Sequence, residues 1–188
     1  MDNTAVIVID MLADLVTGEL KCDRAQRIIP NIAALIAAAR SNKIPVVYSN
    51  DAHYEQDFEV VNRWGKHAIK GTPGAEVIPE LKPAEGDFTV EKRAYSGFYE
   101  TGLDSLLRSL YNGNAADTLV LTGLHANLCV RHTAADAFFR GYKIIVPKDG
   151  VEAFTQKEYE EGLEYLNYAY GAKIAESVDD VIREQIRR

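Results

Sequence analysis

Short apolar runs alternate along the chain with longer segments whose apolar residues recur every three or four positions. The helical segments span about 24–42, 127–140, 155–170 and 178–187, and the runs of strand length are Ala5–Ile9, Pro45–Tyr48, Phe88–Val90, Thr118–Thr122, Lys143–Val146 and Lys173–Ala175. Continuous apolar strands separated by helices are typical of a parallel sheet covered on both faces. We therefore predict an α/β fold, a three-layer α/β/α sandwich of the Rossmann-like kind with a mostly parallel sheet of about six strands.

A long irregular segment, from Ala52 to Gly86, separates the second and third predicted strands. It is rich in proline, glycine and polar residues, and it is too long for an ordinary connection within a compact domain. Loops of this length usually carry function, so we expect some of its residues to belong to a site.

Composition and charge limit the classes of function. The 188 residues are 47% hydrophobic and 26% charged, which fits one globular domain spanning residues 1–188. The net charge of −7 argues against nucleic-acid and membrane partners, and no apolar run approaches a membrane span of roughly 20 residues. Met1–Asp10 lacks a basic region before an apolar stretch, and two cysteines suit a reducing compartment, so we expect a cytoplasmic protein.

Chemically versatile side chains follow several of the predicted strands. Asp10 ends the first strand, Asp51 and His53 end the second, Lys92 follows the third, and Cys129 lies just beyond the fourth at the start of a helix. Ligands bind at the carboxyl ends of strands in open parallel sheets. We therefore expect a carboxylate, an ammonium group, a thiol and a potential metal-binding pair to share one edge of the sheet.

Cys129 is the strongest candidate for a reactive group. A helix N-terminus favours negative charge, so the pKa of a thiol there is expected to be lowered, and neighbouring backbone N–H groups can hold an oxyanion. An inert buried cysteine is the alternative. Asp10 is either a general base or, as is commoner for a carboxylate in this position, a cap of the following loop, and Lys92 could lie in a solvated turn. His132, one turn into the same helix, is expected to face the core or an interface.

Asp51 and His53 are two residues apart, on the same side of an extended segment. His67 lies in the long loop. One carboxylate and two imidazoles suit Zn²⁺, Fe²⁺ or Mn²⁺ with open positions for water. The alternative is that Asp51 turns the chain and the histidines are surface residues.

Taken together, five segments resemble the isochorismatase-like cysteine hydrolases, and most closely their nicotinamidase branch. They occur in the family's order and cover nearly the whole chain: Val6–Asp10, Asn50–His53, Trp64–Glu76, Lys92–Phe98 and Thr122–Ala137. The resemblance implies a parallel sheet between helices and a catalytic triad of Asp10, Lys92 and Cys129.

The resemblance also assigns the surroundings of the triad. It implies an oxyanion hole from the backbone N–H groups of His125 and Cys129, with a cis peptide bond before His125. Asp51, His53 and His67 match the family's metal ligands, with zinc the first expectation and iron or manganese possible. The substrate contacts that it implies are Leu15, Trp64, Tyr95, Leu124 and His125.

The chain departs from the nicotinamidase pattern at four positions. Leu12 and Leu15 stand where glutamine and phenylalanine are common, Glu59 stands where some relatives have a further ligand histidine, and His125 replaces a usual alanine. Leu15 weakens a ring sandwich with Trp64, Glu59 could supply a further protein contact to the metal, and the bulkier His125 could reshape the pocket.

The activity that the resemblance implies is metal-assisted hydrolysis of a small carboxamide, with nicotinamide giving nicotinate and ammonia through a thioester, as in NAD salvage. One alternative is another hydrolase of the family that acts on an N-carbamoyl, ureido or other small amide. A second is a non-catalytic paralogue that binds a small molecule or serves as an interaction module. We expect a homodimer or homotetramer.

Overall fold

The computed structural model describes residues 2–187, so the two ends of the predicted domain, residues 1 and 188, lie outside the described part. Its sheet has seven strands, which are β1 (Thr4–Ile9), β2 (Val46–Asp51), β3 (Phe88–Lys92), β4 (Thr118–Leu124), β5 (Lys143–Pro147), β6 (Val151–Glu152) and β7 (Lys173–Ala175). The order is β3-β2-β1-β4-β5-β7, with β6 beside the end of β4, and these pairs are parallel. The predicted fold class is confirmed, and the two-residue β6 is the strand that the sequence pattern did not predict.

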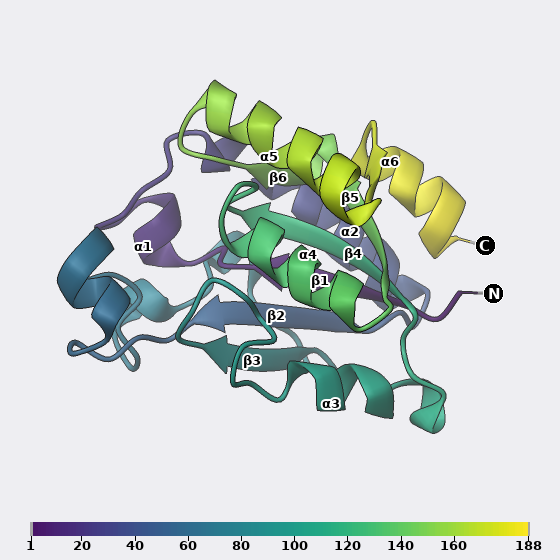
Figure 1. Ribbon diagram of the computed structural model, residues 1–188. Coiled ribbons are helices and arrows are strands. Elements are labelled where there is room, and N and C mark those ends of the chain that lie inside the picture. Colours follow the sequence, from purple (N-terminus) through teal and green to yellow (C-terminus); the bar gives the residue numbers. More distant parts are fainter. Residues whose placement is uncertain (1, 188) are drawn as a thin grey trace.

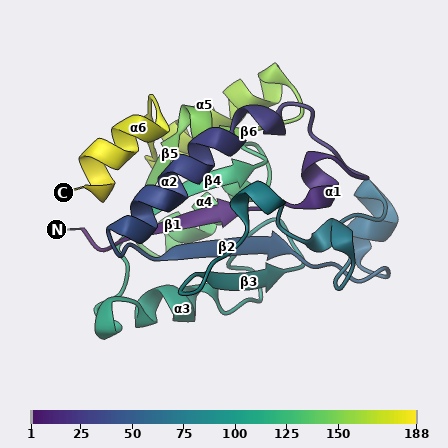
Figure 2. The same cartoon turned by 180° about the vertical axis from the view of Figure 1, so that it is seen from behind.

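Helices cover both faces of the sheet, and each face has its own apolar core (Figures 1 and 2). One face packs against α2 (Ile29–Ser41) and α6 (Val178–Val181), and the other against α3 (Leu103–Ser109), α4 (Cys129–Phe139) and α5 (Gln156–Tyr170). The central strand β1 supplies both cores by alternation, with Val6 and Val8 on the first face and Ala5, Ile7 and Ile9 on the second. This alternation explains why a fully buried strand is a continuous apolar run.

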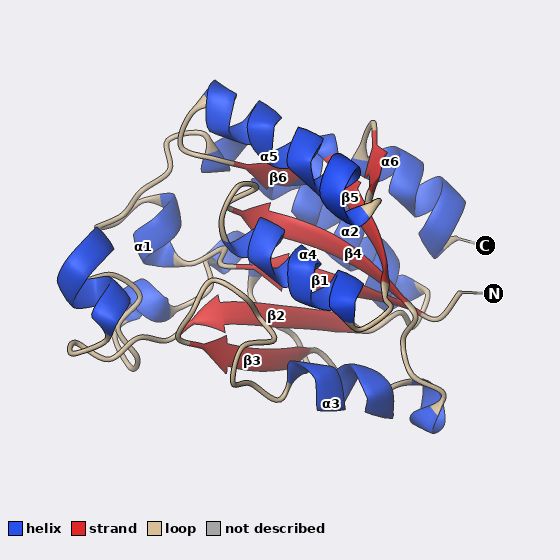
Figure 3. Ribbon diagram, in the orientation of Figure 1, coloured by secondary structure: helices blue, strands red, loops and turns tan. Residues whose placement is uncertain are grey.

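Several predicted helices have different bounds in the structure (Figure 3). The segment at 24–42 divides into a single turn at Ala25–Arg27 and then α2, with Pro30 in the first turn of the helix. The final segment is α6 followed by a wider helical turn at Ile182–Ile186. The four-residue α1 (Ala13–Val16) and the seven-residue α3 were not predicted, because they are too short to show a helical repeat.

The long segment between β2 and β3 contains three isolated helical turns, at Val60–Trp64, Pro73–Ala75 and Pro79–Leu81. It lies beside the carboxyl ends of the strands (Figure 1). Its residue His53 forms a bridge with Ile69, and the N–H of Ala68 donates to the carboxylate of Asp14. The segment is therefore fixed over the edge of the sheet where the candidate residues lie.

Gly123, near the end of β4, brings that strand close to β1. Its φ is +100°, and a Cβ at this position would lie 2.0 Å from the carbonyl oxygen of Ile9. Only glycine fits such an approach. The contact places the turn after β4 beside Asp10, which directly follows β1.

Within residues 2–187, no helix combines the length and the apolar character that crossing a bilayer requires.

Candidate active site

The structure brings Asp10, Asp51, Lys92 and Cys129 together at the carboxyl edge of the sheet. Strands β3, β2, β1 and β4 are neighbours in that order, and Asp51 is the register partner of Lys92. Asp10 follows β1, and Cys129 begins α4 after the turn from β4. All four side chains are buried. Residues up to 119 positions apart in the sequence therefore meet because their strands are adjacent.

The Lys92 ammonium group is the centre of this cluster. Its Nζ lies 2.8 Å from Oδ2 of Asp10 and 3.6 Å from Sγ of Cys129, and it also forms an ion pair with Asp51. The second oxygen of Asp10 accepts a 2.7 Å hydrogen bond from the backbone N–H of Asp51. Asp10 has a φ of +53°, a conformation that aspartate tolerates better than most residues. The triad that the resemblance implied is thus in mutual reach.

Burial and charge set the protonation of the cluster. Burial raises the pKa of Asp10 to about 6, with a further contribution from the Asp51 carboxylate, and Lys92 opposes both. Burial by itself would lower the pKa of Lys92, but the neighbouring carboxylates and the Cys129 sulfur raise it well above its ordinary value. Lys92 therefore stays an ammonium group in the core, while Asp10 has a proton affinity suited to exchange near neutral pH.

The expectation of a lowered thiol pKa at Cys129 is wrong for the resting site. Burial raises the pKa of this thiol well above its ordinary value, the carboxylates of Asp10 and Asp51 add to the effect, and only Lys92 lowers it. Desolvation therefore outweighs the attraction of the neighbouring Lys92 ammonium group. A thiol in this setting becomes a nucleophile by giving its proton to a neighbour, and Asp10 is in hydrogen-bond contact with it.

The turn from β4 into α4 is closed by backbone hydrogen bonds just before Cys129. The carbonyl of His125 accepts hydrogen bonds from the N–H groups of Leu128 and Val130, at 2.9 and 3.2 Å. Cys129 is the first residue of α4, where the helix itself does not use the backbone N–H. The peptide bond between Leu124 and His125 is cis, as the resemblance implied.

Asp51, His53 and His67 form a buried group that could hold a metal ion. Each offers one ligand atom, and these atoms all lie within 4.8 Å of one another. The rings of the two histidines are 4.9 Å apart between centroids. Nδ1 of His67 lies 2.9 Å from the carbonyl oxygen of Gly65, which orients the ring so that Nε2 is free to bind metal.

The polar atoms of His53 fit a cation at this group. Its side chain is fully buried, yet neither ring nitrogen has a hydrogen-bond partner. Nε2 is 3.6 Å from Asp51 and Nδ1 is 3.5 Å from Asp57, which are long separations for hydrogen bonds. Leaving a buried polar atom unpaired is costly, and a shared cation between Asp51 and His53 removes that cost.

Glu59 lies next to the same group. Its Oε1 is 4.0 Å from Nε2 of His67. Burial raises the pKa of Glu59 to about 7, with a further contribution from Asp51. A carboxylate in this position is close enough to join the donor set when a neighbouring positive charge favours its ionised form.

A small aromatic cavity covers Cys129. Its free space is about 20 Å³, roughly the room for one water. Its lining residues are Leu15, Leu20, Asp51, Glu59, Trp64, Tyr95, His125, Leu128, Cys129 and Phe154. The rings are joined to one another, since Trp64 Nε1 donates to the Tyr95 hydroxyl at 2.9 Å and His125 stacks on Phe154 with centroids 4.0 Å apart.

Most of the substrate contacts that the resemblance implied line this cavity. Leu15, Trp64, Tyr95 and His125 do so, whereas Leu124 is fully buried in the apolar core with α2 and is not among the lining side chains. His132 is exposed and lies beside the Tyr95 ring, so it does not face the core, and the alternative that it faces an interface stays a prediction.

Sequence reasoning missed Leu20, Leu128 and Phe154 among the lining residues, and Phe154 is the one of them that carries a ring. It follows β6, which pairs with the end of β4, and the N–H of Ala126 donates to the carbonyl of Glu152 at 2.8 Å. A two-residue strand leaves almost no signal in the sequence. A phenylalanine a few residues beyond the fifth predicted strand was the only available indication.

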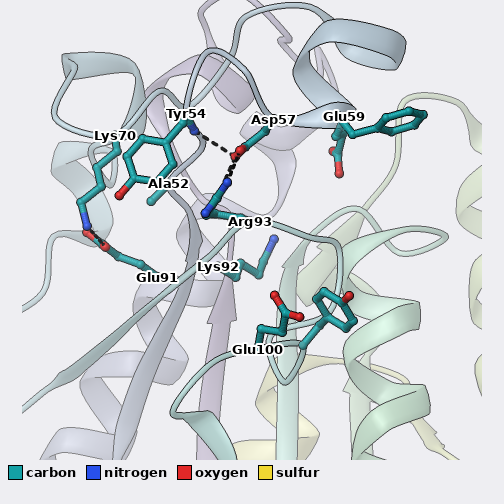
Figure 4. A pocket seen from close by; sticks show the side chains of 11 residues that line it. Ala52, Tyr54, Asp57, Glu59, Lys70, Glu91, Lys92, Arg93 and Glu100 are labelled. Carbon is teal, nitrogen blue, oxygen red and sulfur yellow. Dashed lines mark hydrogen bonds and ion pairs between the residues drawn. The ribbon is translucent and has the colours of Figure 1, made fainter.

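A wider pocket of about 510 Å³ lies on another side of Lys92 and Glu59. Figure 4 shows Arg93 turned toward Asp57 and Lys70 turned toward Glu91. Because Lys92 is also paired with carboxylates, each cation that lines this pocket has an acidic partner. The thiol lines the small aromatic cavity and not this wider pocket.

A thiol, a carboxylate and an ammonium group at the carboxyl edge of a parallel sheet are the groups that a hydrolase with a sulfur nucleophile requires. Comparison with known proteins identifies the family. The isochorismatase domain model matches residues 4–179, so the chain belongs to the isochorismatase family. It is a hydrolase that acts on non-peptide C–N bonds.

Solved structures of relatives cover almost the whole chain. An N-carbamoylsarcosine amidase from Thermoplasma acidophilum is 43% identical, with a TM-score of 0.86 over 95% of this chain and 98% of that one. The nicotinamidase PncA of Bacillus subtilis is 31% identical, with a TM-score of 0.85 over 93% and 99%. A pyrazinamidase of Pyrococcus horikoshii in complex with zinc is 30% identical, with a TM-score of 0.83 over 92% and 98%.

Proposed function

We propose that the protein is a cysteine amidohydrolase of small carboxamides, with nicotinamide as the first candidate substrate. The observation that carries this proposal is the meeting of Asp10, Lys92 and Cys129 in one buried cluster, with Nζ of Lys92 within 3.6 Å of both reactive partners. This arrangement supplies a nucleophile, a proton acceptor and a fixed positive charge. The same single domain would supply the metal group beside them.

In the proposed reaction Asp10 takes the proton of Cys129 as the sulfur attacks the amide carbonyl. The backbone N–H groups of His125 and Cys129 hold the oxyanion, a contribution of about 3 kcal/mol for each donor. Asp10 then gives the proton to the leaving nitrogen, so that ammonia departs and a thioester remains. A water molecule, deprotonated by Asp10, hydrolyses the thioester to the carboxylic acid and restores the thiol.

Lys92 compensates the negative charge of the cluster during these steps. Its ammonium group lies between Asp10 and Asp51, so the negative charge that passes from Asp10 to the sulfur stays beside the same cation. In a buried site such a fixed charge is worth far more than in water.

The metal, zinc in the first instance, would be held by Asp51, His53 and His67, with Glu59 as a further candidate ligand. Bound there, a divalent ion would supply a positive charge that positions a ring nitrogen of the substrate or a water molecule. The zinc complex of the Pyrococcus horikoshii relative and the unpaired nitrogens of His53 support this assignment.

We predict that His53→Ala lowers the zinc content of the purified protein at least tenfold, because it removes one of three ligands. Elemental analysis after dialysis measures the content. His132→Ala is the matched control, since that histidine is exposed and outside the metal group, and it should retain the content of the parent protein. Equal zinc in both variants would refute the ligand assignment.

The lining of the cavity supports an uncharged amide. Among the described residues that line it, none is an arginine or lysine, while two are acidic and four carry rings. A substrate carboxylate would meet Asp51 and Glu59 without a basic side chain on that lining to receive it. A flat carboxamide such as nicotinamide matches the aromatic walls.

Hydrolysis of an N-carbamoyl or ureido compound is the second candidate. The observation that favours it is the 43% identity to an N-carbamoylsarcosine amidase, against 31% to the nicotinamidase. His125 is the feature of the cavity that could adapt it to such a substrate.

An ammonia-release assay with product identification separates the candidates. We expect nicotinamide to give nicotinate with a kcat/KM at least tenfold above those of N-carbamoylsarcosine, ureidoacrylate and acetamide. A tenfold preference for an N-carbamoyl or ureido compound would overturn the choice of nicotinamide. The same preparation, measured by light scattering, tests the proposed homodimer or homotetramer.

A further inference from the structure

The imidazole of His125 has an unused hydrogen-bonding atom next to the candidate nucleophile. The residue is only 3% exposed, and its Nε2 is buried without a partner. The ring lines the cavity over Cys129. Leaving a buried nitrogen unsatisfied is costly, and such atoms in a cavity wall are normally paired when the cavity is filled.

The ring is held in one orientation by two neighbouring strand ends. Its backbone follows β4, and Phe154, on which it stacks at an interplanar angle of 26°, follows β6. The carbonyl of His125 is fixed by two hydrogen bonds from the start of α4. The imidazole is therefore a preorganised part of the cavity wall.

The charge of the ring limits what it can recognise. Burial lowers the pKa of His125 to about 4, Lys92 and His67 act in the same direction, and only Asp51 opposes them. The imidazole is uncharged at neutral pH. It can form a hydrogen bond with a polar atom, but it cannot neutralise a carboxylate.

We propose that His125 is a specificity-determining residue, whose Nε2 forms a hydrogen bond with a nitrogen of the substrate close to the reacting carbonyl. This inference rests on the proposed amidohydrolase function and narrows its substrate class. Two kinds of amide offer such a nitrogen. The ring nitrogen of a heteroaromatic carboxamide would accept from Nε2–H when the metal binds a water molecule and not that nitrogen, and the N–H beside the carbonyl of a ureido compound would donate to Nε2. Simple alkyl and phenyl carboxamides lack it.

Two pairs of substrates isolate the hydrogen bond to His125, because the two members of each pair differ in a single atom or group. Nicotinamide and benzamide differ in the ring nitrogen, and N-carbamoylglycine and succinamic acid differ by N–H against CH₂ beside the carbonyl. The variant is His125→Phe, which keeps a ring to stack on Phe154 and the backbone N–H of residue 125. The measurement is the ratio of kcat/KM within each pair, for the parent protein and the variant.

We expect the parent protein to prefer the nitrogen-containing member of one pair, and the variant to lose that preference by about fivefold to tenfold, the worth of a hydrogen bond of about 1 kcal/mol. The pair that responds identifies the source of the nitrogen. General damage to the fold lowers both members alike and leaves the ratio unchanged. A ratio in His125→Phe equal to that of the parent protein, in both pairs, overturns the proposal.

Binding measurements test the same hydrogen bond independently of turnover. In a Cys129→Ala background, calorimetry with and without His125→Phe reports the Kd ratio of each pair when no turnover occurs. Equal Kd ratios, or no binding of any of the four compounds, also overturn the proposal. Retained activity of Cys129→Ala itself would instead contradict the proposed function, so the two failures are distinguishable.

Discussion

Replacing Cys129 with alanine is expected to abolish amide hydrolysis, with a loss of kcat of at least 10⁴-fold, because no other nucleophile lies in the group formed with Asp10 and Asp51. The side chain is small and buried beside apolar residues of α4 and β4, so the melting temperature should change by only a few degrees. The measurement is ammonia release at saturating substrate, together with thermal unfolding.

Cys22→Ser is the matched control for that variant. Cys22 is also buried, but its sulfur donates to the carbonyl of Ala153 at 3.2 Å and lies outside the candidate site. A serine can keep this hydrogen bond, and we expect near-parental turnover. Comparable activity of Cys129→Ala and Cys22→Ser would remove Cys129 as the nucleophile.

Lys92→Met is expected to impair both activity and stability. The substitution keeps the length of the side chain but leaves the buried carboxylates of Asp10 and Asp51 without their shared cation. Breaking a buried ion pair by removing one partner costs about 3–5 kcal/mol. We expect a loss of that size in the free energy of unfolding in urea, measured with a chelator present, and a loss of kcat of at least 10³-fold.

Lys70→Met supplies the comparison for a surface lysine. Lys70 pairs with Glu91 at an exposed position, and exposed pairs contribute about 0–1 kcal/mol. Its unfolding free energy should therefore stay within 1 kcal/mol of the parent value. If Lys92→Met were no less stable than Lys70→Met, the picture of a buried, charge-balanced cluster would be wrong.

The sequence pattern was sufficient for the fold class and for the meeting of the candidate residues. Continuous apolar strands predicted a parallel sheet, and the rule for strand ends placed Asp10, Asp51, Lys92 and Cys129 on one edge. The metal group followed from the spacing of Asp51 and His53 and from the long loop that carries His67. These features depend on periodicity and topology, which a single sequence contains.

Other features depend on contacts that the sequence does not contain. The pKa of Cys129 is decided by burial and by two carboxylates from other strands, so the helix N-terminus alone predicted the wrong direction. Phe154 reaches the cavity through the two-residue β6, which has no recognisable pattern. Because the position of Phe154 was not predicted, the stacking of His125 on the Phe154 ring could not be predicted either.

The position of β3 has a consequence for how the protein acquires activity. This strand forms one end of the sheet, and it delivers Lys92, which joins residues from β1 and β2. If the centre of the sheet assembles first, the edge strand β3 is the last of β1, β2, β3 and β4 to pair, because β2 is its neighbour in the sheet. Segments with few contacts also open most readily. Recovery of turnover after dilution from denaturant should then lag behind recovery of helical signal, so that catalysis reports the completed topology rather than the collapsed chain.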